Sequence, residues 1–229
     1  MAEPRDHGPL PALLACLSLV TGLVDSYSYL VLGHVFVANM TGNVVFLGFG
    51  LARVGGISLS AVLLALLAFA AGAALGGRWG AARVLHRGLL LSLGTATQAV
   101  LLLVAALLAS AAEVSGVSGR TVRLALIGLL AVAMGIQNAV VRRLAVPDMA
   151  TTVLTMTVTG LFADSVPRQV RLRRLAGLAA MLAGAALGGI LLHWVSVPAP
   201  LWAAATLLTG AATAAQLLAR RPGSAAAWG

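Results

Sequence analysis

Long apolar runs separated by short polar stretches fill the chain from residue 10 to residue 219. Six of these runs are long enough for helices that cross a bilayer, and they lack the alternation typical of membrane β-strands. They predict spans at residues 10–32, 58–77, 89–112, 121–141, 175–195 and 200–219. Two shorter apolar segments, residues 37–52 and 149–163, are marginal for a full crossing. The pattern predicts an all-α integral membrane protein.

Composition agrees with a membrane protein and excludes a soluble globule. Hydrophobic residues make up 60% of the chain and charged residues only 9%, with a mean hydropathy of +1.01. The net charge of +9 comes from fifteen arginines, which lie mostly in short loops between apolar runs. This placement indicates membrane topology rather than nucleic-acid binding. The single cysteine, Cys16, excludes an internal disulfide framework.

The arginines also test whether the short segments cross the membrane. If both segments re-enter and leave on the side they came from, Arg53, Arg120 and Arg123 face one side and the other twelve arginines face the opposite side. If both cross, the division is ten to five. The positive-inside rule favours six spans, two short broken or re-entrant helices and cytoplasmic termini. Eight spans with a parallel repeat remain the alternative.

An internal repeat accounts for the order of the segments. Residues 135–163 resemble residues 22–50, and the sequence AGAALGG occurs at both 71–77 and 183–189. We predict one membrane domain with repeat halves at 10–112 and 121–219, a linker at 113–120 and a tail at 220–229. Three spans in each half give the two copies opposite orientations, which is the inverted-repeat plan of many transporters.

Asp25 is the most unusual residue of the first span. An ionised, unpaired carboxylate within the membrane costs at least about 2.5 to 3.5 kcal/mol. Asp25 must therefore be protonated, paired or hydrated, which fits a proton- or cation-coupling group. The alternative is a structural carboxylate that hydrogen-bonds to a neighbouring helix and locks the bundle.

Polar residues at the start of each short segment form a second candidate feature. Asn and Thr cap helix N-termini, and Gly allows close approach of a ligand or backbone. Helix N-termini inside the membrane would present free N–H groups to an anionic or polar solute. Ordinary capping at the water interface is the alternative. The candidate solute- or ion-binding residues are Asp25, Ser26, Tyr29, Asn39, Thr41, Gly42, Asn43, Gln137, Asn138, Thr151 and Thr152.

Two pairs of glycines are spaced for close helix packing. Gly72 with Gly76, and Gly184 with Gly188, form small-xxx-small motifs in corresponding spans. We expect them to pack helices within the chain, with homodimerisation as the alternative. The arginines at residues 168–174 form the densest basic run, which we interpret as an anchor at anionic lipid headgroups.

No catalytic motif is present, and the four histidines lack metal-ligand spacing. We therefore expect neither an enzyme nor a metal or cofactor site. The leading hypothesis is a secondary transporter for an unidentified small solute, with its site at the repeat interface and H⁺ or Na⁺ as the candidate coupling ion. The alternatives are a membrane scaffold or partner subunit and a small-solute channel.

Two motifs resemble a known family. The run VDSYSYLVLGHVFVANMTGNVVFLG and the later GIQNAVVRRLAVPDMATT are similar to the "ANMTGN" core and "G-x-Q-N" echo of the YoaK-like family of uncharacterised bacterial membrane proteins. The resemblance covers about residues 13–219. It implies an inner-membrane protein of six to seven spans, for which transport as a permease is presumed.

Overall fold

Eight α-helices make up the regular structure within residues 8–81, 87–116, 119–144 and 154–221, the parts of the chain that the computed structural model describes. They are α1 (Leu10–Val31), α2 (Met40–Leu51), α3 (Leu59–Ala81), α4 (Arg87–Ser115), α5 (Arg120–Leu144), α6 (Leu154–Ala163), α7 (Arg168–Trp194) and α8 (Ala199–Ala219). All but α2 and α6 are long and apolar enough to cross a membrane. The predicted all-α membrane fold with six candidate spans is confirmed.

The backbone conformation of Gly33 ends α1. Gly33 has φ +91°, a left-handed conformation that glycine adopts without steric cost, and His34 follows with φ +59°. The His34 N–H donates to the Tyr29 carbonyl over 3.0 Å, which is the long-range bond of a Schellman motif. The chain therefore turns back sharply, and Val35, Val37 and Ala38 are buried.

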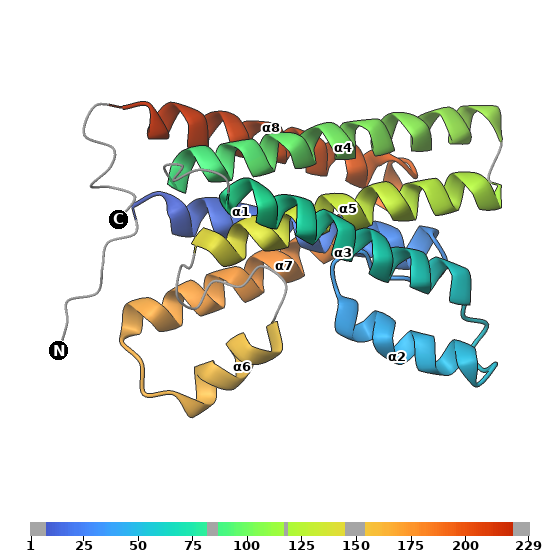
Figure 1. Ribbon diagram of the computed structural model, residues 1–229, viewed down its shortest axis with the longest axis horizontal. Coiled ribbons are helices and arrows are strands. Elements are labelled where there is room, and N and C mark those ends of the chain that lie inside the picture. Colours follow the sequence, from blue (N-terminus) through green and yellow to red (C-terminus); the bar gives the residue numbers. More distant parts are fainter. Residues whose placement is uncertain (1–7, 82–86, 117–118, 145–153, 222–229) are drawn as a thin grey trace.

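The path of α2 is that of a re-entrant helix. α1 ends and α3 begins at the same end of the bundle, and α2 starts near the middle of the bundle and runs outwards to that end (Figure 1). Its 12 residues span about 18 Å, too short for a hydrocarbon core of about 30 Å.

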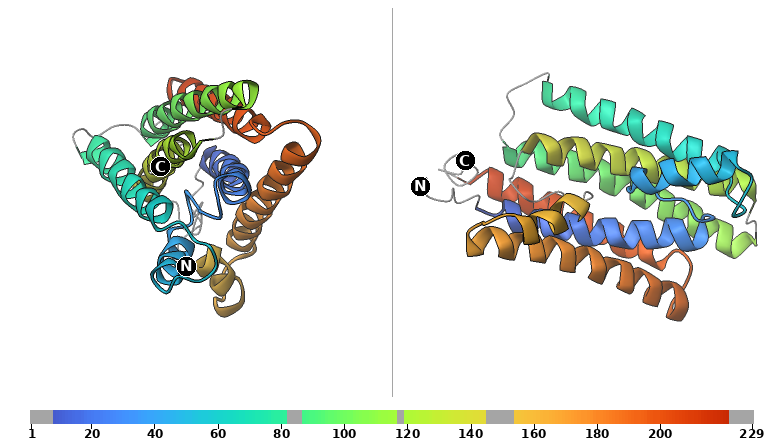
Figure 2. Two further views of the ribbon diagram at one scale, coloured as in Figure 1. Left: turned by 90° about the vertical axis from the view of Figure 1, so that its right-hand side faces the viewer. Right: turned by 90° about the horizontal axis from the view of Figure 1, so that it is seen from below.

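The chain makes a similar excursion at the opposite end, where α5 ends, α6 runs outwards and α7 begins (Figure 1). Both short helices lie on the same side of the bundle (Figure 2).

Long helices pair across the two predicted halves. α1 packs against α7 and α8, α5 packs against α3 and α4, and α4 packs against α8. The closest approaches occur at glycines. A Cβ on Gly184 would overlap the Leu19 carbonyl of α1, and a Cβ on Gly72 would overlap the Val132 carbonyl of α5. Gly188 faces Ser26 of α1 and Gly76 faces Ile136 of α5, so all four predicted packing glycines lie at contacts within the chain.

Gly22 and Gly135 supply the other side of these contacts. Gly22 lies against Met181 and Ala185 of α7, and Gly135 lies against Phe69 and Ala73 of α3. Because Gly22 and Gly135 occupy matching positions in the two similar segments, the α1–α7 and α5–α3 contacts use corresponding glycines.

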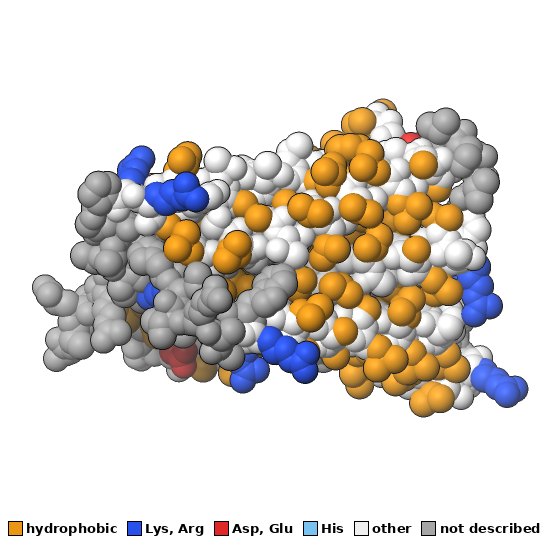
Figure 3. All heavy atoms as spheres, turned by 45° about the horizontal axis from the view of Figure 1, so that its top comes forward, with side chains coloured by type: hydrophobic (Ala, Val, Ile, Leu, Met, Phe, Trp, Pro, Cys, Tyr) orange, Lys and Arg blue, Asp and Glu red, His pale blue; other side chains and the backbone are white. Residues whose placement is uncertain are grey.

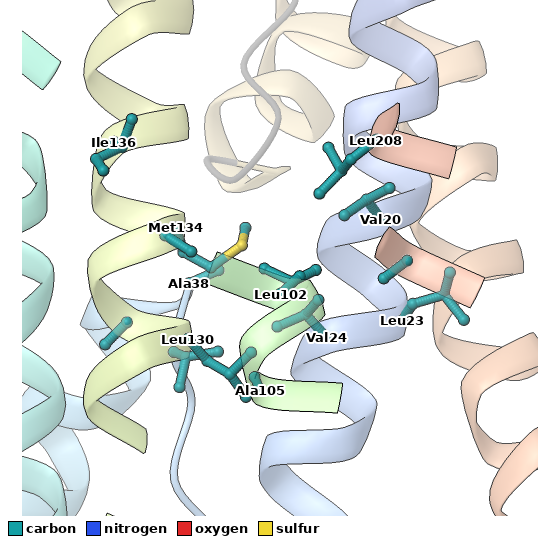
Figure 4. Close-up of a cluster of buried hydrophobic side chains, with 14 of the residues drawn as sticks. Val20, Leu23, Val24, Ala38, Leu102, Ala105, Leu130, Met134, Ile136 and Leu208 are labelled. Atoms are coloured by element: carbon teal, nitrogen blue, oxygen red, sulfur yellow. The ribbon is translucent and has the colours of Figure 1, made fainter. Parts of the chain in front are cut away.

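The apolar core lies between α1, α4, α5 and α8. Val20 and Val24 of α1, Leu102 of α4 and Met134 of α5 belong to one buried cluster (Figure 4). Ala38, from the segment that leads into α2, is part of the same cluster. The re-entrant segment is therefore packed into the bundle and not laid on its surface.

Arginines lie at both ends of the bundle, in unequal numbers. Arg53, Arg120 and Arg123 lie at the end where α1 and α4 stop, and the remaining described arginines are in or beside helix ends at the opposite end. On the face in Figure 3, hydrophobic and uncharged side chains cover the surface between two sets of arginines.

Two sequence predictions need correction. α7 begins at Arg168 instead of residue 175, so the basic run forms its first two turns. Arg174 is 6% exposed and pairs with Asp164 over 2.9 Å, because the helical period turns its side chain inwards beneath Gly160. It therefore anchors the end of α6 and is not a headgroup contact. Around the predicted linker at 113–120, α4 continues to Ser115 and α5 starts at Arg120.

Candidate functional site

Asp25 fixes the polypeptide that enters α2. Its side chain lies in the last third of α1 and is 6% exposed. The Oδ1 atom accepts hydrogen bonds from the backbone N–H groups of Val37 (3.3 Å) and Ala38 (3.1 Å). These donors precede α2 and have no helical partner, so the carboxylate supplies the acceptor that water would supply outside a membrane.

The second carboxylate oxygen of Asp25 has no such partner. Oδ2 is buried and makes no hydrogen bond with any residue that the structure describes. A carboxylate oxygen in a low-dielectric interior is costly unless it binds a proton or a cation or meets a donor. The two oxygens of Asp25 therefore differ: Oδ1 accepts two backbone hydrogen bonds, and the buried Oδ2 accepts none from the described residues.

Asn43 and Asn39 complete the entrance of α2. Asn43 is fully buried, and its side chain pairs with both backbone groups of Phe36: Oδ1 accepts from the N–H over 3.0 Å, and Nδ2 donates to the carbonyl over 2.6 Å. Asn39 is the N-cap and accepts from the Gly42 N–H over 3.3 Å. The polar residues of this segment thus hold residues 36–43 in one conformation.

Aromatic rings cover the same segment. Tyr29 stacks on Phe36 with ring centroids 5.1 Å apart, and Phe36 stacks on Phe46 of α2 at 5.8 Å. A Cβ on Gly42 would lie 2.9 Å from the Phe36 ring, so Gly42 lets this ring lie against the start of α2. The stack ties the last turn of α1 to the first turns of α2.

A buried hydrogen-bonded chain of two glutamines and one threonine links α4, α5 and α1. The Gln98 Nε2 of α4 donates to the Gln137 Oε1 of α5 over 2.6 Å, and the Gln137 Nε2 donates to the Thr21 hydroxyl of α1 over 2.9 Å. Each of these three side chains is at most 2% exposed. The Oε1 of Gln98 is buried without a hydrogen-bond partner in the described part of the chain.

Thr21 lies on the same face of α1 as Asp25. The two residues are four positions apart on α1, and such residues lie one above the other on the same helix face. The hydrogen-bonded chain therefore reaches the face of α1 that carries the carboxylate. We call the resulting set the Asp25 site; it comprises Asp25, Thr21, Tyr29, Phe36, Val37, Ala38, Asn39, Gly42, Asn43, Gln98 and Gln137.

Only some of the predicted candidates lie in the Asp25 site. Asp25, Tyr29, Asn39, Gly42, Asn43 and Gln137 do. Ser26 faces α7, where its side chain meets Gly188, and its hydroxyl donates to the Leu23 carbonyl of its own helix. Thr41 is exposed. Asn138 is half-buried and donates to the Met134 carbonyl of its own helix over 2.9 Å. Thr151 and Thr152 lie outside the described residues.

Gln98 and Thr21 were not predicted as site residues. Gln98 carried a usable signal, since an amide in the middle of the apolar run 89–112 needs a partner inside the bundle. Thr21 carried none, because a threonine hydroxyl can donate to its own helix, as Thr21 does to the Leu17 carbonyl. Within the described ranges, no three His, Cys, Asp or Glu side chains gather in a geometry that would hold a metal.

Comparisons with known proteins agree with this membrane architecture. Residues 13–215 match the family described as "Protein of unknown function (DUF1275)". Over 153 residues, 66% of this chain, the sequence is 34% identical to the UPF0700 transmembrane protein YoaK of Bacillus subtilis (strain 168). The match spans 65% of the length of that protein. No solved structure matches the chain. The resemblance to YoaK-like proteins is thus confirmed, and the chain is a multi-pass membrane protein that belongs to the DUF1275 family.

Proposed function

We propose that the chain is a secondary transporter for a small solute and that Asp25 is its coupling carboxylate. The observation that carries the proposal is the unequal use of the two Asp25 oxygens. Oδ1 holds the entrance of a re-entrant helix, and Oδ2 is buried and unpartnered within the described residues. A proton or cation on Oδ2 would therefore lie on the same carboxyl group that holds this segment.

Protonation of Oδ2 is compatible with the observed contacts. A proton on Oδ2 leaves Oδ1 as a carbonyl acceptor, so the N–H groups of Val37 and Ala38 keep their partner. The carboxylate and the carboxylic acid thus support the same entrance but differ by one charge in a dry interior. That difference gives a bound ion a means of shifting the balance between two states of α2.

The helix arrangement supports an inverted duplication as the scaffold of this transporter. α1 and α5 run in opposite directions, and each is followed by a short helix. α2 runs outwards to the end of the bundle where α1 ends, and α6 runs outwards to the end where α5 ends (Figure 1). The α1–α7 and α5–α3 contacts use matching glycines. Transporters of this plan place their sites where discontinuous helices from the two halves meet near the midplane.

Arginine placement supports an orientation. The end of the bundle where α1 begins and α8 ends carries most of the described arginines, and the opposite end carries Arg53, Arg120 and Arg123. By the positive-inside rule we place the arginine-rich end in the cytoplasm of a bacterial cell and the entrance of α2 toward the outer side.

Flux into proteoliposomes tests the proposal. The purified chain is reconstituted with an imposed pH gradient or Na⁺ gradient, and uptake is measured for a panel of labelled monocarboxylates, amino acids, nucleobases and sugars. We expect at least one panel member to accumulate above empty liposomes. Asp25→Asn should abolish gradient-driven accumulation and its pH dependence while preserving exchange of the same solute, because the amide mimics the protonated carboxyl. Gradient-driven accumulation by Asp25→Asn equal to that of the wild type would remove Asp25 from coupling.

A scaffold or partner subunit is the second candidate. The observation in its favour is that Asn43, Gln137 and Thr21 all hydrogen-bond within the protein, as residues that only hold helices together would do. A scaffold would show no uptake of any panel member above empty liposomes, with or without Asp25.

A further inference from the structure

A pocket separate from the Asp25 entrance contacts lies at the end of the bundle where α1 and α4 stop. It has a volume of about 460 Å³ and is bounded by the end of α1, the end of α4, the start of α5 and Val197 between α7 and α8. This size is within the range of cavities that bind small molecules. Tyr27, two residues beyond Asp25, belongs to its wall and is 1% exposed.

Three charged residues line the pocket without forming ion pairs among themselves. Glu113, Arg120 and Arg123 all contribute to the wall. Glu113 accepts from the Val197 N–H over 3.2 Å, and Arg120 donates to the Ser60 hydroxyl over 3.1 Å. Within the described residues, the ion-pair contacts of the structure do not include any of the three. The net formal charge of the wall is therefore +1, with two arginines and one glutamate.

Arg123 has hydrogen-bond donors that no described residue accepts. Its side chain is half-buried, its Nε is fully shielded, and its guanidinium makes no hydrogen bond with any described residue. It lies against Gly33, where a Cβ would be 3.4 Å from one terminal nitrogen. A guanidinium offers five donors in a planar fork that matches a carboxylate, and leaving them unmet in a partly dry site is costly.

We propose that this pocket binds a small monocarboxylate through Arg123. One negative charge neutralises the wall, whereas a dianion would bring excess negative charge close to Glu113. The apolar part of the ligand fits against Leu32, Ala109 and Leu126, which also line the pocket. The site is distinct from the Asp25 entrance contacts, and binding there does not require that the protein transports anything.

Calorimetric titration of the full-length protein in detergent at low ionic strength tests this site with butyrate, succinate, inorganic phosphate and butylamine. We expect butyrate to bind the wild type more tightly than succinate or phosphate, and butylamine not to bind. Arg123→Gln should weaken butyrate binding by about tenfold or more. Arg123→Lys, which keeps the charge but loses the fork, should weaken it less.

Arg53→Gln is the matched control, because Arg53 is an exposed arginine at the same end of the molecule and outside the pocket. It should bind butyrate like the wild type. Absence of butyrate binding to the wild type, equal binding by wild type and both Arg123 variants, or tighter binding of succinate or phosphate would each overturn the proposal. The titration measures binding and the flux experiment measures transport. A negative result in the flux experiment therefore does not overturn the butyrate site, and a negative titration does not overturn the transport proposal.

Discussion

Gly184→Ala is expected to lower the thermal unfolding midpoint of the detergent-solubilised protein by about 2 to 12 °C, because overpacking a close contact costs about 1 to 3 kcal/mol. The added methyl group would overlap the Leu19 carbonyl and force α1 and α7 apart. The backbone of a helix cannot move aside as a flexible side chain can. Gly72→Ala should act in the same way on the α3–α5 contact, where the Val132 carbonyl occupies the space.

The chain offers a control for each change. Gly189 on α7 and Gly77 on α3 have open space where a Cβ would be placed. Alanine at either position should leave the unfolding midpoint unchanged or raise it slightly, since alanine has the higher helix propensity by up to about 1 kcal/mol. Equal midpoints for Gly184→Ala and Gly189→Ala would show that the α1–α7 contact is looser than the structure indicates.

Asp25→Ala is expected to destabilise the protein by about 2 to 6 kcal/mol, because it leaves two buried backbone donors without an acceptor and each costs about 1 to 3 kcal/mol. The donors are the N–H groups of Val37 and Ala38. The measurement is the free energy of unfolding in mixed micelles, together with hydrogen exchange of residues 36–43. Exchange should accelerate in this segment before the rest of the bundle is affected.

Asp25→Asn separates the hydrogen bonds from the charge. The amide keeps an oxygen acceptor at the position of Oδ1, so both N–H groups remain bonded and the entrance stays protected. We expect stability close to that of the wild type and unchanged exchange at residues 36–43. A loss as large as that of Asp25→Ala would mean that the negative charge, and not the acceptor, holds the entrance of α2.

The main features of the fold could be predicted because they follow from length and local chemistry. Six runs have the length of a span, and Gly33 marks the end of α1. The short length of α2 and the arginine distribution predicted re-entry. Helix starts were less accurate: the arginines before residue 175 suggested a loop, yet α7 begins at Arg168 because arginine is a good helix former and reaches water from the first turns of a span.

Only part of the membership of the candidate site could be predicted. Asp25 and Asn43 were identified because polar residues in an apolar run need partners. Their partners could not be predicted, since the backbone of residues 36–38 becomes available only after the chain turns back at Gly33. Arg123 and Glu113 were assigned to topology and to the linker, and their meeting at one pocket depends on the pairing of α4 with α5.

The proposed site requires that α2 enters and leaves the membrane on the same side, and cysteine labelling measures this directly. In a Cys16→Ser background, His34→Cys and Val54→Cys place single exposed thiols before and after α2, and Ser165→Cys places one at the opposite end of the bundle. A membrane-impermeant maleimide applied to the outer face should label positions 34 and 54 and not position 165. Labelling of positions 34 and 54 from opposite faces would show that α2 crosses the membrane and would contradict the six-span, re-entrant architecture.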